Sequence, residues 1–177
     1  MFLQGTKTFA LEIVENFRYR LPEHLIFPVG NGGLLLGTHL ALTELRAAGL
    51  HIPMPRLHIA QAAACAPLIH SLEHGASRPL PINPQSTIAG GVSIACPFRG
   101  AQILRAVRDS GGTGIAISDN AIRVARSQIA ISEGLDLEPT AALAFAATAH
   151  LRETGVIGPD DRVLVPATGS GLKDPAA

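Results

Sequence analysis

Two glycine-rich turns hold the residues of this chain that are best suited to chemistry. The first, Pro28-Val29-Gly30-Asn31-Gly32-Gly33, lies between an apolar run over 24–29 and an apolar helical pattern over 34–48. Glycines leave room for backbone N–H groups and a helix N-terminus to close on an anion such as a phosphate. The second, Ala167-Thr168-Gly169-Ser170-Gly171, follows an apolar run over 162–166 and adds two hydroxyl groups. The turns predict a site for a phosphate-bearing ligand.

Helical and extended patterns alternate around these turns. We expect strands over 24–29, 56–61, 113–118 and 162–166, and helices over 9–20, 34–48, 67–74, 100–110, 119–133 and 140–154. Thr6 or Thr8 is the expected cap of the first helix and Asp119 that of the fifth. This order predicts an α/β domain with a mainly parallel sheet. Ligands of such sheets bind beyond the carboxyl ends of the strands, where both turns fall, so we expect the turns to face one crevice.

Composition excludes several classes of function. The 177 residues are 47% hydrophobic, which suits one domain over 1–177 with a sizeable core. Formal net charge is zero and the arginines are scattered, so we expect no nucleic-acid partner and no membrane surface. No secretion signal or membrane-spanning run is evident, which predicts a cytoplasmic protein. Cys65 and Cys96, far apart in small-residue contexts, are expected to be free buried thiols.

One further pattern has the spacing of metal ligands. His70-Ser71-Leu72-Glu73-His74 fits the H-x-x-E-H arrangement of one class of zinc peptidases. The expected helix spans only about two turns, ends at Gly75 and has no evident third ligand nearby. We therefore interpret the segment as a solvent-facing helix end and expect no metal.

The order of five blocks resembles threonine synthase and its relatives, which are fold-type II pyridoxal-phosphate enzymes. The first two blocks are Lys7-Thr8-Phe9-Ala10-Leu11-Glu12-Ile13 and the turn over 28–33. The others are Thr87-Ile88-Ala89, Glu138-Pro139-Thr140-Ala141-Ala142, and a final stretch over 167–175 that ends Gly-Leu-Lys-Asp-Pro. The resemblance implies part of the large domain of such an enzyme, a three-layer sandwich, and pyridoxal 5'-phosphate as cofactor. It also implies a threonine-synthase-like lyase that converts O-phosphohomoserine to threonine and phosphate.

The resemblance assigns roles to residues of both turns. Backbone amides over Gly30, Asn31, Gly32, Gly33 and Leu34 would wrap the cofactor phosphate. The Thr168 hydroxyl would bond the pyridine nitrogen, and Ser170 is a second polar candidate. A neutral hydroxyl leaves that nitrogen unprotonated, unlike a carboxylate. On the residues alone, Thr168 and Ser170 can equally well bond only within their own turn.

The chain departs from the family in its lysines. Such enzymes hold the cofactor covalently on a lysine, but Lys7 and Lys173, the two lysines here, match blocks in which that lysine is not found. We therefore expect no catalytic residue in the chain, which corresponds to the C-terminal half of a complete enzyme. The lysine would come from a complementing N-terminal chain or from the N-terminal half of the same gene product. The alternatives are a non-catalytic remnant that binds pyridoxal phosphate or phosphate, and half of a serine/threonine dehydratase. An uncovered sheet edge also predicts a homo-oligomer or a partner chain.

Overall fold

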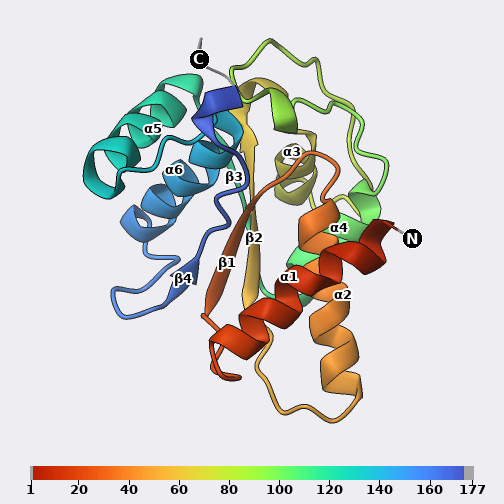
Figure 1. Ribbon diagram of the computed structural model, residues 1–177. Helices are drawn as coiled ribbons and strands as arrows, with labels where there is room; N and C mark the ends of the chain where they lie inside the picture. The colour runs from red at the N-terminus through yellow and green to blue at the C-terminus, as the bar shows by residue number, and fades with distance from the viewer. Residues whose placement is uncertain (1, 174–177) are drawn as a thin grey trace.

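A four-stranded parallel sheet forms the centre of the computed structural model, which describes residues 2–173 (Figure 1). The strands lie in the order β3-β2-β1-β4, and each pairs in parallel with its neighbours. They are β1 (His24–Pro28), β2 (Arg56–Ala62), β3 (Gly114–Ile117) and β4 (Val163–Leu164). The α-helices are α1 (Phe2–Asn16), α2 (Gly33–Ala47), α3 (Pro67–Glu73), α4 (Gly100–Asp109), α5 (Asp119–Glu133) and α6 (Pro139–Glu153), with short 3-10 turns η1 (Ala63–Cys65), η2 (Gly90–Val92) and η3 (Gly171–Lys173).

Helices cover both faces of the sheet. Along β1 successive side chains point to opposite faces, so Leu25 and Phe27 join one apolar cluster and Ile26 joins the other. The first cluster packs α1 to α4 against the sheet, and the second packs α5 and α6. Figure 1 shows these two layers on either side of the strands. The expected three-layer sandwich with a parallel sheet is confirmed.

Local details differ from the sequence-based expectations at several element ends. Helix α1 starts at Phe2, and the Thr6 hydroxyl lies inside it, 3.1 Å from the carbonyl oxygens of Leu3 and Gly33. Ser118, not Asp119, caps α5 by accepting a hydrogen bond from the Ala121 amide. Asp119 instead accepts from the Thr87 hydroxyl and the Ile88 amide, because that loop lies beside it. Strand β4 is limited to two residues since only His24 and Leu25 of β1 pair with it.

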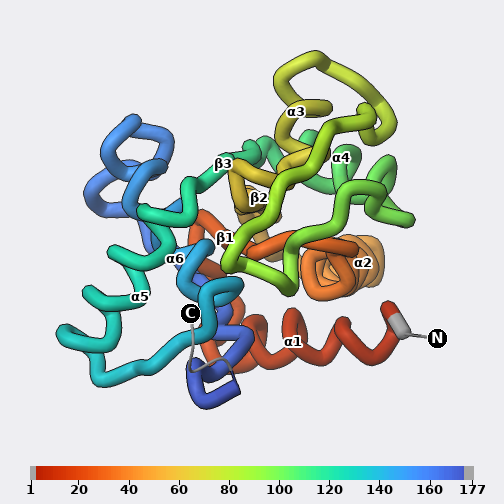
Figure 2. Tube along the Cα trace, turned by 90° about the horizontal axis from the view of Figure 1, so that it is seen from above, coloured from red at the N-terminus to blue at the C-terminus, as the bar shows by residue number. Residues whose placement is uncertain are grey.

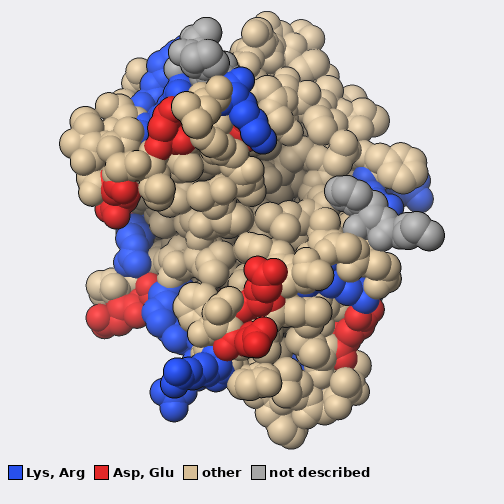
Figure 3. All heavy atoms as spheres, viewed as in Figure 1, with Lys and Arg blue, Asp and Glu red and all other residues tan. Residues whose placement is uncertain are grey.

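The surface on the face of Figure 3 carries positive and negative side chains interspersed among neutral ones.

Cys65 is buried as expected, whereas Cys96 is exposed, so the expectation of a second buried thiol was wrong. Within residues 2–173, none of the helices has both the length and the apolar character needed to cross a bilayer.

A chain of buried and partly buried hydrogen bonds connects the starting ends of all four strands. The Thr113 amide, just before β3, donates to Nδ1 of His58 on β2 over 3.2 Å. Since that nitrogen must accept, Nε2 of neutral His58 carries the proton and donates to Nδ1 of His24 on β1 over 2.8 Å. Nε2 of His24 then donates to Oδ2 of Asp161, just before β4, over 3.1 Å. All three hydrogen bonds therefore donate in the same direction across the sheet, from Thr113 toward Asp161.

Burial, followed by repulsion from His24 and Arg56, lowers the pKa of His58 to about 4. A proton added to Nδ1 of His58 would also face the Thr113 N–H and break that hydrogen bond. Hydrogen bonds from the Gly158 amide and from His24 hold the pKa of Asp161 below its usual value. The hydrogen-bond chain therefore favours a neutral His58 and an ionised Asp161.

The stability of the fold is expected to decrease as the pH falls below the pKa of a free imidazole. Between the ordinary pKa of 6.5 and the folded pKa of about 4, the unfolded chain binds more protons at His58 than the folded chain does. For this residue the free energy of unfolding should be about 2 kcal/mol lower at pH 5 than at pH 7.5. Urea unfolding at the two pH values measures the difference. His58→Asn should reduce the difference, while the exposed His150→Asn should leave it unchanged; equal pH dependence in all three proteins would contradict the expectation.

Candidate functional site

The first glycine turn joins the end of β1 to the start of α2. Gly32 immediately precedes the helix and has a φ of +68°, a conformation that side-chain-bearing residues adopt only with strain. The first bond of this helix that spans four residues runs from the Leu36 amide to the Gly32 carbonyl over 2.9 Å. The amides of Gly33, Leu34 and Leu35 precede it and, as in the first turn of any α-helix, have no intrahelical acceptor. These donors and the positive end of the helix dipole suit an anion.

Other parts of the chain fill the space around the first turn. A Cβ at Gly30 would lie 2.9 Å from the Gly91 carbonyl oxygen and from Cδ1 of Ile94. A Cβ at Gly32 would lie 2.5 Å from Cδ1 of Ile103, a buried residue of α4. Both glycines are therefore required by contacts within the chain, and the amides that follow them are the candidate donors to an anion.

Asn31 and Leu34, also predicted as site residues, differ in how their side chains are placed. Asn31 is exposed, and its Oδ1 accepts a hydrogen bond from the Phe98 amide over 3.4 Å. The Leu34 side chain packs against the first apolar cluster, so only its backbone amide is available to a ligand. A cavity of about 210 Å³ opens here and is lined by Leu3, Asn31, Gly33, Phe98 and Arg99.

The second glycine turn lies at the same edge of the sheet, beyond the end of β4. Side chains of Glu138 and Asp136 occupy the positions that a Cβ on Gly169 or Gly171 would take. Backbone bonds hold the same segments together: the Glu138 amide donates to the Gly169 carbonyl and the Gly171 amide to the Asp136 carbonyl. This turn is thus seated on the segment that leads into α6.

The two hydroxyls of the second turn differ in their partners. Ser170 Oγ accepts a hydrogen bond from the Leu172 amide over 3.3 Å, so it does bond within its own turn. Thr168 is exposed, and among residues 2–173 its hydroxyl has no hydrogen-bond partner. Thr168 is therefore the hydroxyl that is free to contact a ligand.

The segment around η2 links the two turns. Figure 2, which looks onto the edge where the strands end, shows the yellow-green chain after α3 crossing that edge between α6 and α2. Gly91 contacts Gly30 on one side, and on the other its amide donates to Oγ1 of Thr140, at the start of α6, over 3.1 Å. Glu138, one residue before α6, contacts Gly169. The turns share an edge and a set of supports, but the cavity at the first turn includes no residue of the second.

Sequence patterns did not indicate Gln61, which positions the first turn. It is fully buried at the end of β2, where its Nε2 donates to the Val29 carbonyl and its Oε1 accepts from the Leu68 amide, each over 3.0 Å. One amide side chain therefore joins the first glycine turn to the start of α3. A polar residue near the end of a largely apolar strand was the available signal.

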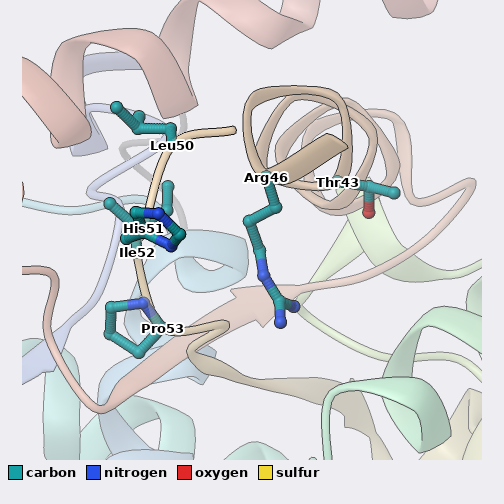
Figure 4. Close-up of a pocket in the computed structure, with 6 residues that line it drawn as sticks. All are labelled: Thr43, Arg46, Leu50, His51, Ile52 and Pro53. Carbon is teal, nitrogen blue, oxygen red and sulfur yellow. The ribbon is translucent and has the colours of Figure 1, made fainter. Parts of the chain in front are cut away.

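A larger cavity, of about 580 Å³, lies at the other end of α2. Figure 4 shows Arg46 extending from the last turn of α2 beside the loop that carries Leu50, His51, Ile52 and Pro53. The 15 residues of α2 separate this cavity from the glycine turn by about 20 Å. It takes no part in the candidate site.

Comparison with known proteins points to one family. The sequence pattern of the family described as "Pyridoxal-phosphate dependent enzyme" matches residues 1–169. Threonine synthase of Methanosarcina acetivorans is 32% identical over 173 residues, and that of Methanocaldococcus jannaschii is 33% identical over 175. These alignments cover 98% and 99% of this chain but 43% of each relative, so the chain spans less than half of their length.

Solved structures agree with the fold. An L-serine ammonia-lyase from Rhizomucor miehei superposes with a TM-score of 0.74 at 24% identity, covering 95% of this chain and 51% of that one. Serine racemase of maize superposes with a TM-score of 0.74 at 23% identity, covering 95% of this chain and 48% of that one.

Alanine at Gly32 should destabilise the fold more than the backbone conformation alone explains. Gly134, at the end of α5, has the same φ of +68° but nothing within 4 Å of an added Cβ, so it provides a matched control. We expect Gly134→Ala to cost about 1 kcal/mol. Gly32→Ala should cost about 1 to 3 kcal/mol more because the methyl group must displace buried Ile103. Urea unfolding measures both, and equal costs would show that the contact with Ile103 is unimportant.

Proposed function

Because this chain belongs to the family of pyridoxal-phosphate-dependent enzymes, we propose that it forms the phosphate-binding half of a threonine-synthase-like lyase. The complete lyase would convert O-phosphohomoserine to threonine and phosphate. The observation that carries the proposal is the start of α2, where free amides and a helix N-terminus follow a glycine turn. Both supply what a phosphate dianion needs. The similarity to threonine synthases supports this specificity over that of a dehydratase.

The donor set fits the cofactor phosphate. Amides of Gly33, Leu34 and Leu35 would donate to the phosphate oxygens, and Arg99, which lines the adjoining cavity, would supply a positive charge. Gln61 would keep the turn in place through the Val29 carbonyl. At the second turn the Thr168 hydroxyl would hydrogen-bond the pyridine nitrogen without protonating it. Pyridoxal phosphate, when bound, supplies an electron sink for negative charge at the substrate α-carbon.

The lysine that holds the cofactor would come from outside these 177 residues. Lys7 on α1 forms an ion pair with Glu44 on α2, 2.5 Å from Nζ to Oε2, and so is engaged in helix packing. Lys173 lies exposed in η3, after the second turn. A complementing chain, or another part of a longer polypeptide, would supply the lysine and the groups that move protons at the substrate. The competing proposal is a module that binds the phosphate without turnover; it also has no cofactor lysine in these residues, so the ion pair of Lys7 agrees with both proposals.

Changing Asn31 to aspartate should weaken cofactor binding without weakening the fold. The new carboxylate keeps the acceptor for the Phe98 amide and interacts favourably with the N-terminus of α2. It would also repel a phosphate dianion, so affinity for pyridoxal phosphate should fall at least about tenfold. Equilibrium dialysis measures affinity, and thermal unfolding measures stability. Asn120→Asp makes the same change in the first turn of α5 and should leave the affinity unchanged.

Two results would contradict the proposed phosphate site: wild-type chain that binds no pyridoxal phosphate, or Asn31→Asp that binds as tightly as wild type. Reduction of the mixture with borohydride and peptide mapping then tests the lysine. We expect no stoichiometric adduct. A stoichiometric adduct on Lys7 or Lys173, abolished by changing that lysine to arginine, would show that the chain provides its own cofactor lysine.

A partner is proposed for the edge that carries both turns. Phe98 and Leu172 are 90% and 87% exposed, and each adjoins one of the turns. Large apolar side chains exposed beside a binding site are typical of surfaces that another chain covers. We propose that a second copy, or a complementing chain with the lysine, packs here.

The chain alone should form a dimer or a larger oligomer through this edge. The double variant Phe98→Ser, Leu172→Ser should shift it toward monomer because it removes apolar surface from the contact. Ile131→Ser removes an equally exposed side chain, 83% accessible, from α5 and should leave the oligomer intact. Size-exclusion chromatography with light scattering gives the mass of each protein. A monomeric wild type at high protein concentration would exclude self-association.

A further inference from the structure

We propose that His70, Glu73 and His74, at the end of α3, bind a first-row divalent metal ion such as Zn²⁺. One ligand atom from each side chain lies within 4.8 Å of the others. Two imidazole nitrogens and a carboxylate oxygen form a ligand set that zinc accepts, and a water molecule completes a tetrahedral site. None of these three residues lines the cavity at the first glycine turn, and none has a part in the proposed phosphate site.

Helix geometry explains why three side chains gather on so short a helix. Residues three and four positions apart lie on one face, so the spacing over 70, 73 and 74 suffices without a longer helix. The end of α3 is also fixed by a Schellman arrangement. The Gly75 amide donates to the Leu72 carbonyl over 3.1 Å and the Ala76 amide to the Ser71 carbonyl over 2.9 Å. The ligands thus stand on a defined backbone.

His74 is already oriented as metal-binding histidines are. Its Nδ1 donates to the backbone carbonyl of His70 over 2.7 Å, so Nε2 is the ring nitrogen that remains available to a metal. The two rings lie close, with centroids 4.2 Å apart. A carbonyl that holds the distal ring nitrogen fixes both the tautomer and the direction of the ligand.

The other two ligands are free to move onto the ion. Within residues 2–173, neither the His70 ring nor the Glu73 carboxylate has another hydrogen-bond or ion-pair partner. With metal–ligand bonds of about 2.1 Å, tetrahedral ligand atoms lie about 3.4 Å apart, so small side-chain rotations close the present spacing. His70 and Glu73 also line a cavity of about 270 Å³ together with Asn83, which gives space for a coordinated water.

The chain contains a matched control at the end of α6. His150 and Glu153 repeat the histidine and glutamate at the same spacing, but Thr154 replaces the second histidine. The end of α6 has the same Schellman bonds, from the Gly155 amide to the Arg152 carbonyl and from the Val156 amide to the Leu151 carbonyl. Thr154 donates to the His150 carbonyl, as His74 does to that of His70. The two helix ends therefore differ in one candidate metal ligand, which is His74 in α3 and is replaced by Thr154 in α6.

Isothermal titration of the untagged, metal-free chain with Zn²⁺ at pH 7.5 tests the proposal. We expect one ion per chain, a raised melting temperature at saturating Zn²⁺, and affinity reduced at least about tenfold in His74→Ala and in Glu73→Gln. His150→Ala should bind as wild type does, and so should Cys96→Ser, which removes the exposed thiol. Circular dichroism of each variant confirms folding.

Several outcomes would overturn the site. They are the absence of saturable binding to wild type, unchanged affinity in His74→Ala, or loss of binding in Cys96→Ser or His150→Ala. In the reverse test, Thr154→His should add a second ion per chain, because it supplies the missing ligand at the end of α6. A stoichiometry that remains at one in this variant would contradict the geometric argument.

Discussion

The arrangement of the sheet depends on the hydrogen-bond chain from Thr113 through His58 and His24 to Asp161. Its members come from the start of every strand, in the spatial order of the sheet. Each buried polar atom in it has a partner, so a strand that slipped along its neighbour would leave at least one group unsatisfied in an apolar interior. Apolar side chains cover both faces of this sheet, so an alternation of apolar and polar residues contributes little to its register. The polar chain therefore fixes the relative position of the strands at one edge.

The register set at the starting ends of the strands also determines how their carboxyl ends are arranged. Parallel strands of defined register bring their carboxyl ends together, which places the glycine turns after β1 and β4 on the same side of the molecule. Gln61 ties the first turn to the start of α3, and the Gly91 segment bridges toward the start of α6. The edge that carries the glycine turns is irregular loop, but buried or backbone hydrogen bonds anchor it at several points. A rigid scaffold with functional groups on its loops is the usual division of roles in such folds.

Periodicity in the sequence was sufficient to predict the alternation of elements, the parallel sheet and the position of both turns, because these depend on local patterns. Contacts between distant segments were not predictable. Asp119 looked like a helix cap, but Thr87 and Ile88 occupy its carboxylate and Ser118 takes the cap. The hydrogen-bond chain joins His24 to His58, 34 positions away, and to Asp161, 137 positions away. No spacing rule in the sequence indicates such pairs. Likewise, the glycines of the first turn suggested an open cradle, whereas Gly91 and Ile103 lie against them.

These close contacts distinguish two roles of a glycine motif: allowing the backbone to pack closely, and leaving space for a ligand. At Gly30 and Gly32 the chain itself occupies the space that a side chain would need, so both glycines are needed for folding. A descendant of such a protein that no longer bound any cofactor would still be under selection to keep the motif. Recognition of the motif in a sequence consequently reports a backbone architecture. Evidence of a ligand has to come from the neighbouring amides and from groups such as the Thr168 hydroxyl, which the fold itself does not use.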